Sequence, residues 1–235
     1  MNDKLILPEW PYAYASPASE IKLGGIHIIG FEFDGTVCFR KGASRGPDAF
    51  RRVSEGIESY SPYLNVDIDE DRIPLFDLGN LRRDREAQEN AYPSLNKSFN
   101  EILEGIDLNR QKSRLITLGG EHSVSLAPIE KYLADFPDLV VIHLDAHADL
   151  RDGYLGNYYS HASIIRRALD RFSDGHELIQ YGIRSGTREE YKWMDENKTI
   201  SRSRKDFMDK VRNLDDDRPI YLTLDLDFFD PSFVP

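Results

Sequence analysis

The sequence contains little cysteine, a minority of basic residues and no long apolar segment. Its single cysteine, Cys38, rules out a disulfide framework or a cysteine-based zinc cluster within the chain, and a reducing compartment is the simple expectation. The 30 Lys and Arg residues are outnumbered by 41 Asp and Glu residues, which gives a formal net charge of −11. Such an acidic chain argues against nucleic acid as a partner and leaves room for a small cationic substrate.

Membrane and export signals are also missing from the sequence. No window approaches the ~18 consecutive apolar residues of a membrane span, and the N-terminal sequence MNDKLILPEWPYAY lacks a basic segment followed by a long apolar one. With 40% hydrophobic residues among 235, the chain can nevertheless bury a full core, most simply as one domain. We therefore predict a soluble cytoplasmic protein with no membrane contact.

Apolar segments alternate with segments of helical spacing along the chain. The pattern predicts strands at residues 25–33, 73–77, 114–118, 139–145, 178–183 and 220–227, with a turn at Gly79. It predicts helices that begin near Pro47 and that span residues 93–106, 124–134, 162–171 and 203–214. Residues 1–24 are expected to form an N-terminal arm and residues 25–235 the main domain. The alternation predicts an α/β fold whose mostly parallel sheet is covered by helices on both faces.

Acidic or histidine side chains stand where three of these strands end: His122 follows residues 114–118, Asp145 ends residues 139–145, and Asp225 lies in residues 220–227. Alternate side chains of an extended strand share a face, so Asp145, His147 and Asp149 can converge as their strand enters its loop. Carboxylates with one imidazole suit Mn, Zn or Fe. A buried strand followed by a solvated acidic loop is the alternative interpretation of this segment. Asp225 and Asp227 end another apolar strand, and ligands gather at the carboxyl ends of parallel strands, so a metal site is favoured.

Three motifs resemble the metal-binding motifs of the ureohydrolases, the arginase and agmatinase family: GGEHS at 119–123, DAHAD at 145–149 and DLDFFDP at 225–231. They occur in the family's order, and the likeness covers nearly the whole chain from Gly25. It implies a three-layer arginase-like fold. It also implies two manganese ions per subunit, with Asp145 and Asp225 bridging both. The implied ligands are His122, Asp145, His147, Asp149, Asp225 and Asp227.

The resemblance assigns no metal-binding role to Asp230 and His143, two residues in or beside these motifs. Asp230 is expected to fix the conformation of its loop or to hydrogen-bond a metal ligand without contacting the metal. His143 matches no ligand of the family and is expected to be a hydrogen-bonded core histidine. For His122 by itself, a capping or packing role is the alternative.

Segments at 56–64, 149–163 and 182–191 resemble agmatinases more than arginases. The resemblance implies hydrolysis of a guanidinium C–N bond, with agmatine giving putrescine and urea in polyamine biosynthesis, or a related compound such as guanidinobutyrate as substrate. Asp149, or another acidic ligand beside the attacking hydroxide, is expected to orient that hydroxide and to pass a proton to the departing amine. His161 matches a family histidine suited to substrate contact or proton shuttling, and a surface or helix-start role is its alternative. Homotrimers or homohexamers are a further implication of the family.

The chain ends at Pro235, whereas family members continue through a Gly- and Pro-rich loop, which contains a glutamate that holds the guanidinium, and a final strand. The resemblance thus predicts a truncated ureohydrolase whose sheet lacks its final strand, with metal ligands present and catalysis impaired. One alternative is a catalytically inactive relative that binds metal or assists subunit assembly. Another is a phosphatase like the haloacid dehalogenases, using the loop at Asp34. Glu32 stands where those enzymes carry their nucleophilic aspartate, and its extra methylene argues against that reading.

Overall fold

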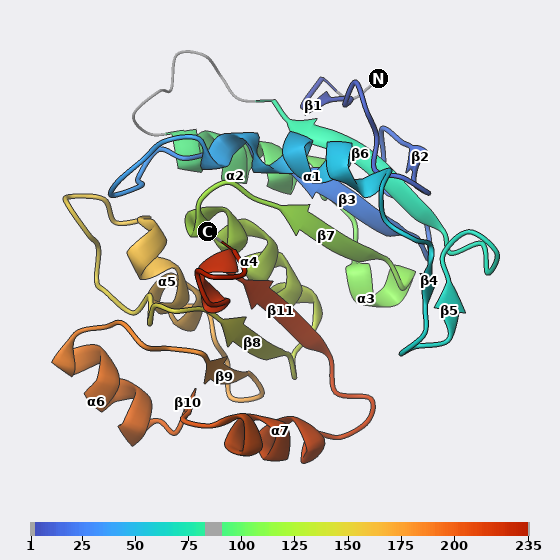
Figure 1. The fold of residues 1–235 in the computed structure, drawn as a ribbon. Coiled ribbons are helices and arrows are strands. Elements are labelled where there is room, and N and C mark those ends of the chain that lie inside the picture. The colour runs from blue at the N-terminus through green and yellow to red at the C-terminus, as the bar shows by residue number, and fades with distance from the viewer. Residues whose placement is uncertain (1–2, 83–90, 235) are drawn as a thin grey trace. The chain divides into compact units, whose positions relative to one another are not determined.

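The computed structural model describes residues 3–82 and 91–234 (Figure 1). The chain divides into two compact units, Met1–Ala127 and Pro128–Pro235, and each unit has a sheet of its own. The predicted α/β architecture with mostly parallel strands is confirmed. In the described part of the chain, no helix combines the length and the hydrophobicity needed to cross a bilayer.

The sheet of the first unit is centred on β3 and β6, which are parallel neighbours. β7 extends this sheet in parallel beyond β3, β1 pairs antiparallel with β6, and β2 also pairs with β6. The N-terminal residues, expected as an arm, thus contribute two short strands. The strands are β1 (Leu5–Ile6), β2 (Ser16–Pro17), β3 (Ile26–Gly30), β6 (Leu75–Leu81) and β7 (Arg114–Leu118), with a separate pair β4 (Tyr60–Ser61) and β5 (Val66–Asp67).

The helices of the first unit begin close to their predicted positions. Pro47 lies in the first turn of α1, where its missing N–H costs no hydrogen bond. The elements are η1 (Ala43–Arg45), α1 (Gly46–Ser54), α2 (Ala91–Ile102), α3 (Leu108–Gln111) and η2 (His122–Ser125), and α4 (Leu126–Asp135) begins at the end of this unit.

The turn predicted at Gly79 is wrong, because Gly79 lies inside β6. Its φ is 79°, and the pairing of β3 with β6 shifts register between Ile28 and Gly30. A Cβ at Gly79 would lie 2.1 Å from the carbonyl oxygen of Ile6. Glycine is needed here both for a left-handed backbone and for the close approach of β1.

A buried ion pair ties α1 to β6. The side chain of Arg51 is 1% exposed, and its guanidinium donates to both carboxylate oxygens of Asp77 at 2.9 and 3.0 Å. It also donates to Asn80 Oδ1 at 2.6 Å and to the Gly79 carbonyl at 3.0 Å. Asp77 in turn accepts the backbone N–H of Tyr12 at 2.9 Å. Both charges are therefore well satisfied, as burial requires.

The second unit contains a four-stranded, fully parallel sheet in the order β10, β9, β8, β11. Its strands are β8 (Val140–Leu144), β9 (Glu177–Tyr181), β10 (Ile200–Ser201) and β11 (Ile220–Leu224). The remaining elements are η3 (His161–Ser163), α5 (Ile164–Leu169), α6 (Arg188–Glu196), α7 (Arg204–Arg212) and η4 (Leu226–Phe228). All of the strands and long helices predicted for this part of the sequence are present, mostly shorter by one to a few residues at their ends.

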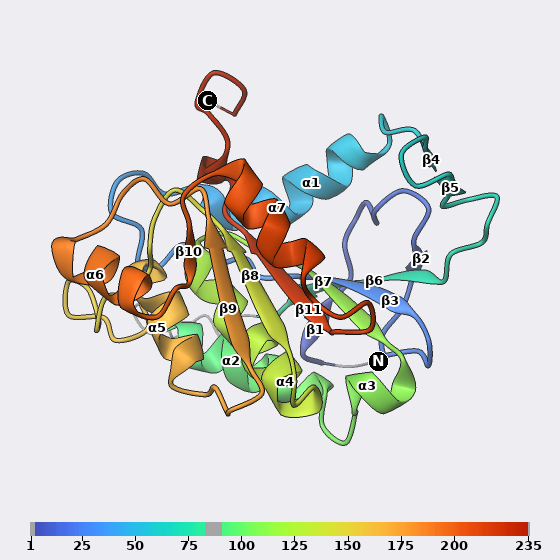
Figure 2. The same ribbon diagram turned by 90° about the horizontal axis from the view of Figure 1, so that it is seen from below.

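Helices pack on both faces of this second sheet (Figure 2). Phe207 and Val211 of α7 pack on the face formed by Val140, Ile142 and Ile179. On the opposite face, the ring of Tyr132 in α4 meets Tyr221 of β11 edge-on, with ring centroids 5.2 Å apart. The expected helix–sheet–helix layering is thus realised within this unit.

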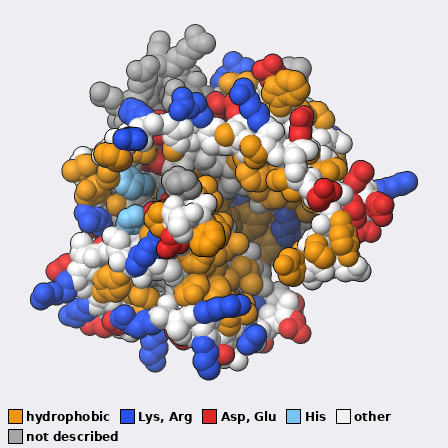
Figure 3. Space-filling model, in the orientation of Figure 1, with side chains coloured by type: hydrophobic (Ala, Val, Ile, Leu, Met, Phe, Trp, Pro, Cys, Tyr) orange, Lys and Arg blue, Asp and Glu red, His pale blue; other side chains and the backbone are white. Residues whose placement is uncertain are grey.

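β11 lies at the edge of the second sheet and leaves apolar side chains exposed. Ile220, Leu222 and Leu224 are 46%, 54% and 41% exposed, while the alternate residues Tyr221 and Thr223 are buried. Hydrophobic side chains gather over this strand in Figure 3, with charged side chains of both signs interspersed around them. The alternation places these three side chains on the α7 face of the sheet.

Candidate metal centre

Two neighbouring strands of the second sheet, β8 and the edge strand β11, each end one residue before an aspartate. β8 ends at Leu144 and β11 ends at Leu224, and the two strands are parallel neighbours. The N–H of Asp225 donates to the Leu144 carbonyl at 3.0 Å, so the pairing continues just past the strands. Both acidic segments therefore begin at the same carboxyl edge, where parallel sheets commonly bind ligands.

The sequence suggested that Asp145, His147 and Asp149 converge because alternate residues of a strand share a face. The structure brings residues after β8 together in a different way. The strand stops at Leu144, and Asp149 adopts a left-handed backbone with φ of 53°. The Asp149 carbonyl accepts the N–H groups of Ile165 and Arg166, both at 3.1 Å, at the start of α5. A non-glycine residue in this conformation costs about 1–3 kcal/mol, which the surrounding contacts must offset. Asp149 is thus held by a turn that sequence periodicity does not reveal.

His147 lies between two carboxylates. Its Nδ1 is 2.9 Å from Asp227 Oδ2 and 3.6 Å from Asp145 Oδ1. Hydrogen bonding to Asp145 and then to Asp227 raises the pKa of His147 to about 10, although partial burial opposes the shift. The metal-free protein therefore carries an imidazolium where two carboxylates attract a positive charge. The donor atoms of these three side chains lie within 4.8 Å of one another, so the set fits a divalent cation that displaces the proton.

Three buried residues of the same unit form an adjoining group: His143, Asp145 and Asp149. Asp145 belongs to both groups. His143 is fully buried, and its Nε2 lies 2.9 Å from Asp145 Oδ2. The expectation of a hydrogen-bonded core histidine is confirmed.

Arg184 connects the loop after β8 to the segment after β11. Its backbone N–H donates to the Ala146 carbonyl at 2.8 Å. Its guanidinium donates to the carbonyls of Asp227, Phe228 and Phe229, the latter two at 3.3 Å. The Ala146 N–H also donates to Asp227 Oδ1 at 3.1 Å. Nothing in the periodicity of the sequence singled out Arg184.

The remaining predicted ligands are placed as follows. Asp225 is half-buried, and its carboxylate accepts the N–H of Asp227 at 3.2 Å at the start of η4. Asp225 is in neither of the two groups described above. His122 belongs to the first unit, where it is buried and begins η2 after β7.

The residues before His122 shape its backbone. A Cβ at Gly120 would lie 1.9 Å from the Phe33 carbonyl oxygen, so only glycine fits there. The buried carboxylate of Glu121 accepts the N–H of Thr36 at 2.6 Å and the hydroxyl of Ser123 at 2.6 Å. Glu121 therefore anchors the segment that carries His122, a role that sequence reasoning missed.

Asp230 and His161 occupy local positions in their loops. Asp230 accepts the Ser232 N–H at 2.9 Å, and hydrogen bonds from the Ser232 side chain and backbone lower its pKa. Such bonding is that of a loop-fixing residue. His161 begins η3, and its ring lies edge-on to Tyr154 with centroids 6.0 Å apart.

Comparison with known proteins identifies the family to which this chain belongs. Residues 25–235 match the Arginase family. The chain belongs to the arginase family. It is 34% identical over 235 residues to the agmatinase of Bacillus subtilis (strain 168), an alignment that covers 97% of this chain and 72% of that protein. It is also 34% identical to the N(1)-aminopropylagmatine ureohydrolase of Thermococcus kodakarensis, with coverage of 97% and 77%.

Solved structures agree with this assignment. The crystal structure of the agmatine ureohydrolase of Thermoplasma volcanium superposes with a TM-score of 0.77 at 27% identity, over 97% of this chain and 75% of that one. The predicted membership of the ureohydrolases, with most likeness to agmatinases, is confirmed. The predicted arginase-like fold is confirmed as well.

The arginase-family assignment leaves Asp34 with a structural role. Burial opposes ionisation of Asp34, but hydrogen bonds from the Gly42 N–H and from Ser44 outweigh it and lower the pKa of this carboxyl. Asp34 thus closes its own loop. These contacts argue against a nucleophilic role for Asp34, in agreement with the weak match to the phosphatase motif.

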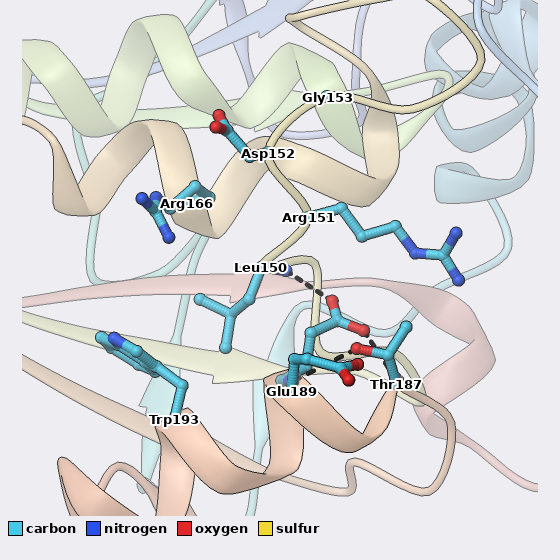
Figure 4. A pocket seen from close by; sticks show the side chains of 9 residues that line it. Leu150, Arg151, Asp152, Gly153, Arg166, Thr187, Glu189 and Trp193 are labelled. Atoms are coloured by element: carbon cyan, nitrogen blue, oxygen red, sulfur yellow. Dashed lines mark hydrogen bonds between the residues drawn. The ribbon is translucent and has the colours of Figure 1, made fainter.

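A pocket of about 420 Å³ lies beside the DAHAD loop in the second unit (Figure 4). Leu150, which follows Asp149, and Trp193 of α6 supply apolar surface, while Glu189 supplies a carboxylate. Glu190 Oε1 accepts the Leu150 N–H at 3.0 Å and its Oε2 accepts the Thr187 N–H at 2.7 Å, which joins α6 to the loop. The charged residues that line the pocket are of both signs: Arg151, Asp152, Arg166, Glu189 and Glu190. The pocket therefore offers apolar surface to a methylene chain and charged partners at its walls.

Proposed function

We propose that this arginase-family enzyme hydrolyses agmatine to putrescine and urea with two bound manganese ions. The observation that carries the proposal is the position of His147, held between the carboxylates of Asp145 and Asp227 at the carboxyl ends of two parallel strands. The names of its relatives support a substrate of the agmatine type, because they include agmatinases and ureohydrolases of N(1)-aminopropylagmatine.

The proposed ligand set combines carboxylates with two imidazoles, a composition that manganese accepts. Bound divalent cations lower the pKa of water and so supply a nucleophile near neutral pH. Asp145 and Asp225 are proposed to bridge the two ions. The six proposed ligands are His122, Asp145, His147, Asp149, Asp225 and Asp227.

Side chains of the chain itself would handle the protons of the reaction. We assign to the Asp149 carboxylate the orientation of the attacking water, the acceptance of its proton and the transfer of that proton to the departing amine nitrogen. Its left-handed backbone, held by two N–H groups of α5, supports a fixed position for this carboxylate. His161 is proposed to contact the substrate or to relay the proton.

The pocket in Figure 4 offers apolar surface and carboxylates to a substrate with an aliphatic cationic tail, and the guanidinium groups of Arg151 and Arg166 line it as well. Trp193 and Leu150 offer surface to methylene groups, and the exposed Glu189 carboxylate offers a partner to a terminal ammonium. Agmatine has both features.

The test is urea release by the manganese-loaded chain with agmatine, arginine and guanidinobutyrate as substrates. We expect agmatine to give the highest kcat/KM, and Asp145→Asn to lower it more than about 100-fold. Asp174→Asn, at an exposed aspartate of the same unit, should leave it unchanged.

The alternatives give different results in the same assay. Manganese binding without urea release would identify an inactive metal-binding relative. Hydrolysis of a generic phosphate ester that Asp34→Asn abolishes would identify a phosphatase. Urea release that survives removal of all metal by a chelator would refute the metal-dependent mechanism.

A further inference from the structure

Gln180 is a fully buried residue of β9 whose side chain reaches the candidate metal centre. It lies directly opposite His143 in the parallel pairing of β8 with β9. Its amide Nε2 is 3.2 Å from the Ala148 carbonyl oxygen and 3.1 Å from His143 Nδ1. Its Oε1 accepts the hydroxyl of Thr199 at 2.9 Å. One side chain thus contacts both the histidine behind Asp145 and the peptide between His147 and Asp149.

These contacts determine which way the amide points. A backbone carbonyl can only accept a hydrogen bond, so the group facing Ala148 must be the NH2 of Gln180. The second hydrogen of this NH2 then points at His143 Nδ1, which must accept it. The neutral imidazole therefore carries its proton on Nε2, and this N–H donates to Asp145 Oδ2 at 2.9 Å.

The result is a directed series of hydrogen bonds through the second sheet. It runs from the Thr199 hydroxyl to Gln180, from Gln180 to His143 and from His143 to Asp145. These four residues are 7%, 0%, 0% and 1% exposed, so little water competes for their bonds. A carboxylate that accepts a fixed N–H is restrained in rotation, which leaves its other oxygen directed toward His147.

We propose that Gln180 is a positioning residue of the metal centre. It sets the Nε2–H tautomer of His143 and thereby the orientation of the Asp145 carboxylate, and it holds the Ala148 carbonyl between two further ligands. In this arrangement His143 is a hydrogen-bond donor to a ligand and not itself a ligand. The proposal rests on the proposed function in one respect, namely that Asp145, His147 and Asp149 bind the metal.

The first test is the affinity of the chain for Mn2+ alone, measured by titration calorimetry. Gln180→Glu keeps the size and the acceptor for Thr199 but removes both N–H donors. We expect it to weaken Mn2+ binding by about 10–100-fold, the usual effect of losing a group that orients a metal ligand. Thr199→Val is the matched control, because it removes only the outer hydroxyl, and we expect an affinity within about threefold of wild type.

The second test reads the tautomer directly and needs no metal. Correlation of the imidazole ring nitrogens with the ring protons by 15N NMR, on the metal-free wild-type chain, identifies the protonated nitrogen of His143. The signal is assigned by its loss in His143→Gln. A purely structural glutamine would leave the tautomer unspecified, whereas our proposal requires the proton on Nε2.

Each outcome decides the proposal. A proton on Nδ1 of His143, or wild-type Mn2+ affinity in a folded Gln180→Glu variant, would overturn it. If that variant does not fold, the tautomer of the wild-type protein decides alone. A wild-type chain that binds no Mn2+ would contradict the proposed function, and the tautomer would still show whether Gln180 fixes His143.

Discussion

At the scale of single residues, His147 makes the metal-free protein sensitive to pH. Its pKa rises from 6.5 to about 10 in the folded chain because it contacts Asp145 and Asp227. The folded state therefore binds this proton more tightly than the unfolded state. Its contribution to stability is fully present below about pH 6.5 and is lost as the pH rises toward 10. We expect the melting temperature of the metal-free chain to fall over this window, as measured by thermal unfolding followed by circular dichroism.

His147→Asn provides the comparison, since asparagine can hydrogen-bond but cannot carry the charge. Its melting temperature should vary less with pH between 6.5 and 10 than that of wild type. Superimposable pH profiles for the two proteins would show that His147 is not charged between the carboxylates. Since a metal must displace the same proton, saturating Mn2+ should also flatten the wild-type profile.

At the scale of elements, the buried ion pair between Arg51 of α1 and Asp77 of β6 stabilises the first unit. Removing one partner of a buried pair leaves the other charge without compensation, so Arg51→Ala should lower the free energy of unfolding by about 3–5 kcal/mol. Arg52→Ala is the matched control, because Arg52 is the exposed neighbour on the same helix and should change stability by less than about 0.5 kcal/mol. Urea denaturation measures both. Similar losses in the two variants would mean that helix propensity, not the buried pair, determines the effect.

Strands with continuous apolar character could be predicted from the sequence, and strands defined by their partners could not. β7 occupies Arg114–Leu118 as predicted, and β11 begins at Ile220 as predicted. β10, at Ile200–Ser201, has only two residues and no periodicity of its own, and it exists because it pairs with β9. Gly79 looked like a turn because glycine favours turns, but the approach of β1 keeps it within β6.

The candidate site shows the same division. The motif residues Asp145, His147 and Asp227 come together, and their residue types predicted a cation site. The left-handed backbone of Asp149 could not be read from the sequence, because contacts with residues 165 and 166 stabilise it. Gln180 was equally hidden. Its importance follows from the register that places it opposite His143, and register is a property of the folded sheet.

At the scale of the whole molecule, the net charge of −11 should assist the capture of a cationic substrate. Agmatine carries a guanidinium and an ammonium group, so the field of the protein favours its approach. Guanidinobutyrate has the same guanidinium, but its carboxylate cancels the charge. If long-range electrostatic attraction contributes to binding, added salt should weaken the binding of agmatine and leave that of guanidinobutyrate unchanged. At 0.1 M salt the Debye length is about 10 Å, so charges farther apart than this are largely screened.

We therefore expect kcat/KM for agmatine to fall severalfold as ionic strength is raised from about 0.01 to about 0.3 M, with kcat nearly constant. For guanidinobutyrate, kcat/KM should stay nearly flat over the same range. The measurement is steady-state urea release with manganese held at saturation, so that salt does not act through metal loss. Equal salt dependence for the two substrates would show that the acidic surface serves solubility alone and that selectivity arises only from contacts within the pocket.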